Sequence, residues 1–220
     1  IYCGQQPLDF VDLLGLSREE AVEYARQYAT DNPFLRNPDY PMFWQNCANF
    51  VSQSLHAGGI PMNDDWYCSP TTEESLPIFL YPGAWLSAKV WTWVVRRNGS
   101  NVWADGNWTS GKVFFHSNTW SATQNHYNYF SDLQNGYIDN TNDDIICIPS
   151  VDTEGIDNTE KNILKASQKV EPGDLVYWIN NEEGVHHATI VTDVKNGQIM
   201  IAGNTKAYSD ELVADRMKEN

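Results

Sequence analysis

Cys47 is the side chain best placed in this sequence to act as a nucleophile. It follows Asn46, a residue type that often caps helices, and it opens a run without helix breakers that ends at Gly58 and Gly59. A cysteine in the first turn of a helix lies beside unpaired backbone N–H groups and the positive end of the helix dipole, and both favour the thiolate. The same N–H groups can stabilise the oxyanion that forms when a thiolate attacks a carbonyl. Because most cysteines are small buried hydrophobic residues, this position alone leaves a structural role open.

Two polar residues with catalytic potential lie near the end of the chain, on either side of a predicted hairpin turn. Asn196-Gly197 separates two apolar runs, which is the strongest short-range signal for a hairpin. With these two residues as the loop, Thr189 faces Asn204, and His187 lies on the same sheet face as both. His187 and Asn204 then become diagonal neighbours with Cα atoms about 7 to 8 Å apart.

His187 is the histidine that this geometry selects, since the adjacent His186 is expected to point to the opposite face. The side-chain carbonyl of Asn204 can accept one ring N–H and leave the other ring nitrogen facing a nucleophile. Cys47, His187 and Asn204 therefore have the residue types needed for nucleophilic catalysis on an amide. The alternative is that two polar groups share a solvated sheet face, and a bulge in the hairpin would break the register.

The elements that must position these residues indicate an α+β domain. Ser17 and Glu20 form a capping box before an amphipathic pattern that predicts a helix ending before Pro33. A second helix is predicted to begin near Cys47. Three apolar runs late in the chain predict antiparallel strands at 171–179, 186–194 and 198–205.

Residues 63–131 are predicted to form a loop-rich aromatic insertion. Short strands are expected at 91–95 and 112–115, and a short helix at 126–133. Its tryptophans are Trp85, Trp91, Trp93, Trp103, Trp108 and Trp120. They could line a groove on which sugar rings stack, or they could serve as core and interface anchors.

The charge balance argues against nucleic acid as a partner. Asp and Glu total 29 against 14 Lys and Arg, a formal net charge of -15, and no Lys/Arg-rich stretch could bind phosphates. The acidic residues 139–162 are expected to form a loop, with a buried strand at 145–148 as an alternative. No run of about 18 apolar residues occurs, so no membrane span is predicted, and no signal peptide is visible.

The sequence predicts neither a metal nor a cofactor. The four cysteines are Cys3, Cys47, Cys68 and Cys147. Their spacing matches no zinc pattern, and if Cys47 is a free nucleophile, the other three allow at most one disulfide. The remaining histidines, His56, His116 and His126, are expected to be structural or exposed. Oligomeric state stays open.

The segment QNCANFVSQSLHAGG, residues 45–59, resembles the DCTNFVSQALHAGG signature of a bacterial putative amidase domain family. HSNTWSATQNHYNYF is similar to the Trp-centred block of that family, and GDLVYW, HHATIVT and AGNT follow in the family's order. The family is related to the papain-like NlpC and CHAP peptidases. The resemblance therefore implies one papain-like domain over residues 1–220, with helices packed on an antiparallel sheet and an insertion at about 63–131.

Carried over to matching positions, the resemblance implies a nucleophile at Cys47, a base at His187 and a third polar residue at Asn204, where the family commonly has histidine. Asn46 replaces the family's aspartate, which keeps its ability to cap a helix. The backbone N–H of Cys47 is expected to line the oxyanion hole, with Gln45 and Asn46 as further candidates. The departure NNEEGVHH before the histidine strand weakens any inference of bound calcium.

The function implied is a cysteine amidase or peptidase acting on bacterial cell-wall peptides, outside the cytoplasm or in the cell wall. Two alternatives remain open. The same cysteine and histidine could transfer the acyl group to an amine, as transglutaminase-like enzymes do. The domain could also be a non-catalytic cell-surface binding module. The bond cleaved is not encoded in any motif of the sequence.

Overall fold

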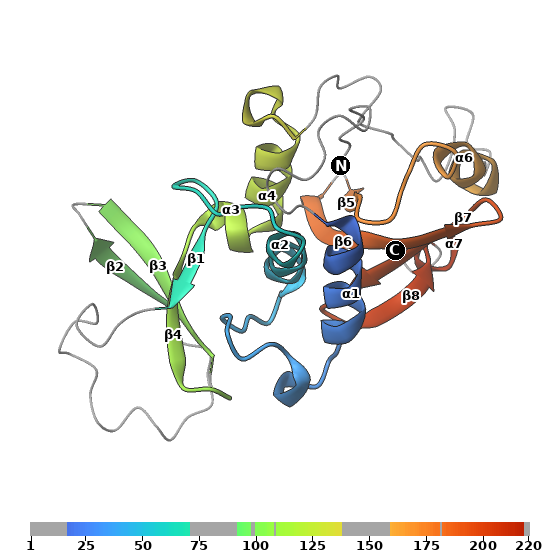
Figure 1. Ribbon diagram of the computed structural model, residues 1–220. Helices are drawn as coiled ribbons and strands as arrows, with labels where there is room; N and C mark the ends of the chain where they lie inside the picture. The colour runs from blue at the N-terminus through green and yellow to red at the C-terminus, as the bar shows by residue number, and fades with distance from the viewer. Residues whose placement is uncertain are drawn as a thin grey trace.

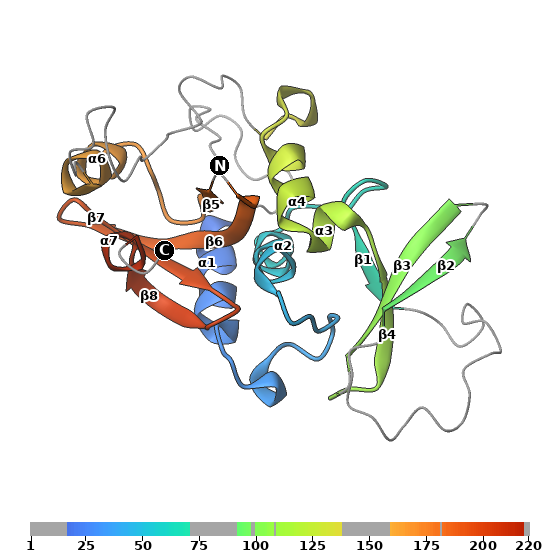
Figure 2. The ribbon, with the colours of Figure 1, turned by 180° about the vertical axis from the view of Figure 1, so that it is seen from behind.

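The computed structural model describes six parts of the chain, namely residues 17–70, 92–97, 100–107, 109–137, 159–180 and 182–217. They form an α+β structure with two antiparallel four-stranded sheets (Figures 1 and 2). The strands of the first sheet, in spatial order, are β5 (Leu175–Asn180), β6 (Gly184–Lys195), β7 (Gln198–Gly203) and β8 (Tyr208–Leu212). The strands of the second sheet, in spatial order, are β1 (Cys68–Pro70), β4 (Lys112–His116), β3 (Ser100–Asn107) and β2 (Thr92–Arg97).

The two predicted helices are confirmed as α1 (Arg18–Tyr28) and α2 (Cys47–Ala57). The Ser17 hydroxyl accepts a hydrogen bond from the Glu20 amide at 3.0 Å, as expected of a capping residue. Helix α2 ends where Gly59 adopts a φ of 93°, a left-handed conformation that glycine takes without strain. None of the helices in the parts described is long and apolar enough to cross a membrane.

Both faces of the β5–β8 sheet are covered. On one face, Ala25 of α1 and Val51 of α2 pack with Ala188 and Ile190 of β6 in one buried cluster. The other face packs against α6 (Thr159–Ala166) and α7 (Val213–Arg216), which lie on the far side of the sheet from α2 (Figure 1). Strand β6, which carries both adjacent histidines, is therefore packed between helices on its two faces.

Residues 63–131 contain a sheet of their own, where mainly loop was predicted. Strands β2 and β4 and helix α4 (Thr123–Phe130) confirm the predicted short elements. Strand β3, which the apolar pattern does not indicate, pairs with both β2 and β4. Trp120, in the short helix α3 (Asn118–Ser121), is fully buried and is therefore a core residue. The strand considered at 145–148 lies outside the described residues.

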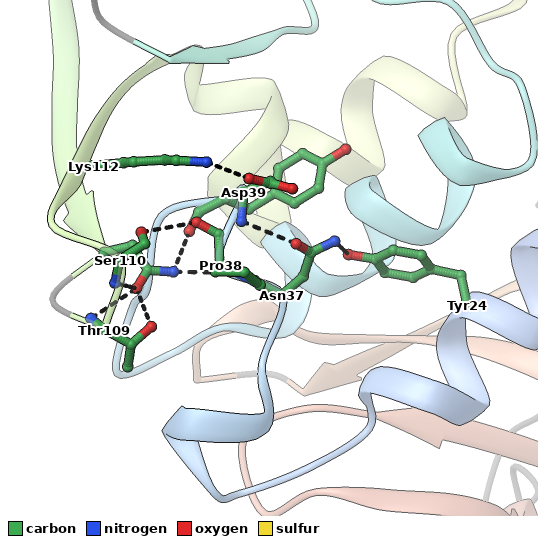
Figure 3. Close-up of polar contacts among 9 residues, drawn as sticks. Tyr24, Asn37, Pro38, Asp39, Thr109, Ser110 and Lys112 are labelled. Carbon is green, nitrogen blue, oxygen red and sulfur yellow. Dashed lines mark hydrogen bonds and ion pairs between the residues drawn. The ribbon is translucent and has the colours of Figure 1, made fainter.

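A loop between α1 and α2 connects the helices to the second sheet (Figure 3). It contains the single-turn helix η1 (Pro33–Leu35). The Asn37 amide donates to the Tyr24 hydroxyl of α1 at 2.8 Å, and Lys112 of β4 forms an ion pair with Asp39. The Asn107 amide of β3 donates to the carbonyl oxygen of Tyr40 at 2.8 Å. The segment that leads into α2 is thereby held from both sides.

The hairpin between β6 and β7 has the predicted turn but not the predicted register throughout. Asn196 and Gly197 have φ of 51° and 75°, the left-handed values of a tight two-residue hairpin turn. Pairing starts as expected with Lys195 opposite Gln198, but a bulge between Val191 and Asp193 shifts it by one residue, so that Ile190 faces Ala202.

The predicted pairing of Thr189 with Asn204 is therefore wrong. Continued past Ile190, the observed register places Thr189 opposite Gly203, and a Cβ on Gly203 would lie 3.1 Å from the Thr189 methyl carbon. A one-residue slip moves every later side chain to the other face of a sheet. Asn204 falls just after the end of β7, and the diagonal pairing expected between it and His187 is lost.

Candidate active site

Cys47 is the first residue of α2, and its side chain is a free thiol in a position only 3% exposed. The expected side-chain cap is absent, because the Asn46 side-chain oxygen accepts from the Asn49 amide at 2.9 Å. The first-turn N–H groups of α2 are thus left without a side-chain cap, next to a sulfur atom. These N–H groups can bind an oxyanion.

Thr123, the first residue of α4, contacts the thiol directly. Its hydroxyl oxygen lies 3.2 Å from the Cys47 sulfur. The next residue, Gln124, accepts a hydrogen bond from the Val185 amide at the start of β6. Helix α4 therefore links the thiol to the strand that carries the histidines. Sequence reasoning missed Thr123, and the only signal for it was its place in the Trp-centred block.

His187 lies on β6 opposite Trp178 and is 9% exposed. Its Nε2 atom is 3.0 Å from the Tyr208 hydroxyl of β8. Burial, together with the positive charges of Arg216 and His186, lowers the pKa of His187 to about 4. At neutral pH the imidazole is therefore uncharged and able to accept a proton.

Tyr208 is a second residue that sequence reasoning missed. Its ring packs against Gly203, and the Arg216 guanidinium carbon lies 4.7 Å from the ring centroid. Burial is the main factor that raises the pKa of Tyr208, Arg216 opposes it, and negative charge on Glu211 or Cys47 raises it further. Tyr208 thus bonds to His187 and lies within electrostatic range of Cys47.

Asn204 is brought close to the start of α2 but not to the His187 ring. It is 1% exposed, and its amide donates to the carbonyl oxygens of Tyr28 and Thr30 at 3.3 and 3.4 Å. The hydroxyl of the following residue, Thr205, accepts a hydrogen bond from the backbone N–H of Asn46 at 2.8 Å. The turn after β7 thereby holds the residue before Cys47, and a catalytic role for Asn204 stays a prediction.

A small hollow beside the start of α2 has both polar and apolar walls. Its volume is about 240 Å³ when the space open to solvent is included. Asn46, Asn204, Gln53 and Arg36 contribute to its walls. Gln45, the other residue considered for the oxyanion hole, is exposed, and its role stays a prediction.

The other histidines fit the structural roles expected of them. His56 places Nδ1 3.0 Å from the carbonyl oxygen of Ile60, at the end of α2. His116 and Asp105 form a buried pair at 2.6 Å, and His126 lies 2.7 Å from the Tyr177 hydroxyl. Over the stretches that the structure describes, no group of three or more His, Cys, Asp or Glu residues could hold a metal ion.

Comparison with known proteins gives one family and one relative. The family described as "Putative amidase domain" matches residues 15–220. The chain is also similar to "Uncharacterized protein YhbB" of Bacillus subtilis (strain 168), with 52% identity over 42 residues. That similarity covers 19% of this chain and 12% of the relative. No solved structure matches the chain.

Proposed function

Since the chain belongs to the putative amidase domain family, we propose that it is a cysteine-dependent amide hydrolase with Cys47 as its nucleophile. The family match indicates an amide hydrolase in general. The observation that favours Cys47 is its position at the start of α2, buried and without a side-chain cap above it. Such a position supplies N–H donors for a developing oxyanion.

In the proposed reaction, His187 accepts the proton of the Cys47 thiol, and the thiolate attacks the carbonyl carbon of the amide. The tetrahedral intermediate collapses to a thioester as the C–N bond breaks, and the His187 imidazolium gives its proton to the leaving amine. Water, deprotonated by the same imidazole, then cleaves the thioester, which releases the acid and restores the thiol. One amide and one water thus give one acid and one amine.

The low pKa of His187 fits the first step, because the ring is neutral before the reaction. In the proposed pair, the negative charge of the thiolate raises the pKa of the imidazolium and so stabilises both ions. The Tyr208 hydroxyl at 3.0 Å can hold the ring in orientation during this exchange. Asn204 contributes to the turn whose Thr205 hydroxyl accepts a hydrogen bond from the backbone N–H of Asn46, and its catalytic role stays a prediction.

We further propose bacterial cell-wall peptides as substrates and a site of action outside the cytoplasm. Both rest on the resemblance of the cysteine segment and the ordered later blocks to the amidase family. The same resemblance supports the relation to papain-like NlpC and CHAP peptidases. The helix that begins at Cys47 and packs against the antiparallel β5–β8 sheet is compatible with that relation.

The test is the pH dependence of iodoacetamide alkylation at Cys47, measured by mass spectrometry of the labelled peptide. For the native sequence we expect alkylation to persist well below the free-thiol pKa of about 8.5. His187→Ala should slow the reaction near pH 6 by about tenfold, the equivalent of one pKa unit.

His186→Ala is the matched control, because the two histidines are adjacent on β6 and only His187 bonds to Tyr208. It should leave the profile close to that of the native sequence. If both variants alkylate like the native protein, or if the native profile is that of an ordinary thiol, the catalytic pair is refuted. A larger effect of His186→Ala would transfer the role of base to His186.

A further inference from the structure

We propose that Thr123 is a catalytic residue of this site, whose hydroxyl donates the hydrogen bond that stabilises the Cys47 thiolate. The proposal rests on Cys47 being the nucleophile. Its basis is the distance of 3.2 Å between the Thr123 hydroxyl oxygen and the Cys47 sulfur, across 76 residues of sequence. Both residues begin helices, so the first turns of α2 and α4 meet at the sulfur atom.

The donor in this contact is fixed by the charge on sulfur. In the thiol state either group can donate. A thiolate has no proton, so the Thr123 O–H must then donate to it, and a hydrogen bond to a charged acceptor is stronger than one to a neutral acceptor. The contact therefore stabilises the thiolate more than the thiol.

Thr123 does not use its hydroxyl for the usual task of a threonine at a helix start. The capping position of α4 is Ala122, and that helix has no side-chain cap. Among the described residues, the Thr123 hydroxyl forms its hydrogen bond with the Cys47 sulfur. A capping role, which would explain the residue without any catalysis, is thus not what the geometry shows.

The contact is held in place from several directions. The Trp120 indole N–H donates to the Asn49 side chain of α2 at 2.7 Å, and the Ser52 hydroxyl donates to the Trp120 carbonyl oxygen at 2.9 Å. At the other end of the segment, His126 bonds to Tyr177 of β5 at 2.7 Å. The first two bonds fix α3, which leads directly into α4, against α2, and the third ties α4 to β5. The Thr123 hydroxyl is therefore oriented before any substrate binds.

The experiment compares the pH midpoint of iodoacetamide alkylation at Cys47 in four proteins: the native chain, Thr123→Val, Thr123→Ser and Asn125→Ala. Valine keeps the shape of threonine and removes the hydroxyl, while serine keeps the hydroxyl. Asn125 is an exposed residue of the same helix and serves as the matched control. We expect Thr123→Val to raise the midpoint by about one pH unit, and the other two variants to stay close to the native value.

The proposal is overturned if Thr123→Val leaves the midpoint unchanged, or if Thr123→Ser shifts it as much as valine does. If valine prevents folding, Thr123→Ala is measured in its place, with the same expectations. The result is separable from the test of His187. If the alkylation midpoint of the native chain depends on His187 but not on Thr123, the proposed hydrolase stands and only the catalytic role of Thr123 is refuted. An ordinary thiol in the native chain overturns both.

Discussion

Acidification should destabilise this protein through His126, a fully buried histidine of α4. Its Nδ1 atom is 2.7 Å from the Tyr177 hydroxyl, and among the described residues its Nε2 atom has no hydrogen-bond partner. Burial lowers the pKa of His126 from 6.5 to about 3. Between these two pH values the unfolded chain binds a proton that the folded chain does not bind. The free energy of unfolding must therefore fall as the pH is lowered through this window.

The size of the effect follows from the two pKa values. Between pH 7 and pH 5 a histidine of pKa 6.5 in the unfolded chain becomes protonated while buried His126 stays neutral, which costs about 2 kcal/mol of stability. We expect His126→Phe to remove this part of the pH dependence. Urea unfolding of the native chain and of the variant, at both pH values, gives the difference directly. The other titrating groups, His187 included, contribute equally to both proteins and cancel.

Tyr177→Phe is the matched control, since it loses the same hydrogen bond but keeps the histidine. It should lower the stability at both pH values and retain the native pH dependence. If His126→Phe loses as much stability between pH 7 and pH 5 as the native chain, then His126 is not held neutral by burial. The reasoning about this residue would then be refuted.

Two glycine substitutions test the packing around the site. In Gly203→Ala the new Cβ would lie 2.6 Å from both the ring carbon Cζ and the hydroxyl oxygen of Tyr208. We expect the Tyr208 ring to move away from His187, so that the rate of amide hydrolysis falls. The free energy of unfolding, measured in urea, should fall by about 1 to 3 kcal/mol. Unchanged activity would show that Tyr208 does not orient His187. In Gly58→Ala the Cβ would lie 2.7 Å from the Ser17 carbonyl oxygen and 2.8 Å from the Ala21 Cβ. We expect α1 and α2 to separate at a similar cost, measured in the same way, and a native midpoint would contradict this close approach.

The features that the sequence predicted correctly are those with local causes. The start of α1 follows from Ser17 and Glu20, which are three residues apart, and the hairpin turn from the adjacent Asn196 and Gly197. The end of α2 after Ala57 follows equally from a local signal, the glycine pair Gly58 and Gly59. Each of these signals depends on backbone geometry that neighbouring residues determine.

The features that the sequence did not predict depend on contacts between distant segments. Thr123 meets Cys47 across 76 residues, and Tyr208 meets His187 across 21. Neither residue carries a pattern that distinguishes it from other threonines and tyrosines. Asn46 does not act as a side-chain cap, because its side-chain oxygen accepts a hydrogen bond from the side-chain amide of Asn49 instead.

The two bulges of β6 explain why one histidine, and not its neighbour, reaches Tyr208. Against β5, Trp178 faces His187 and Ile179 faces Val185, so His186 is the extra residue of the first bulge. Against β7, the second bulge moves Gly203 opposite Thr189. Because glycine has no side chain, the Tyr208 ring can lie against that position and extend its hydroxyl to His187. Without the second bulge, Asn204 would occupy the position opposite Thr189, and its side chain would fill the space that the Tyr208 ring now takes. The irregular strand thus selects the partner of the proposed base, and a regular hairpin would have selected a different one.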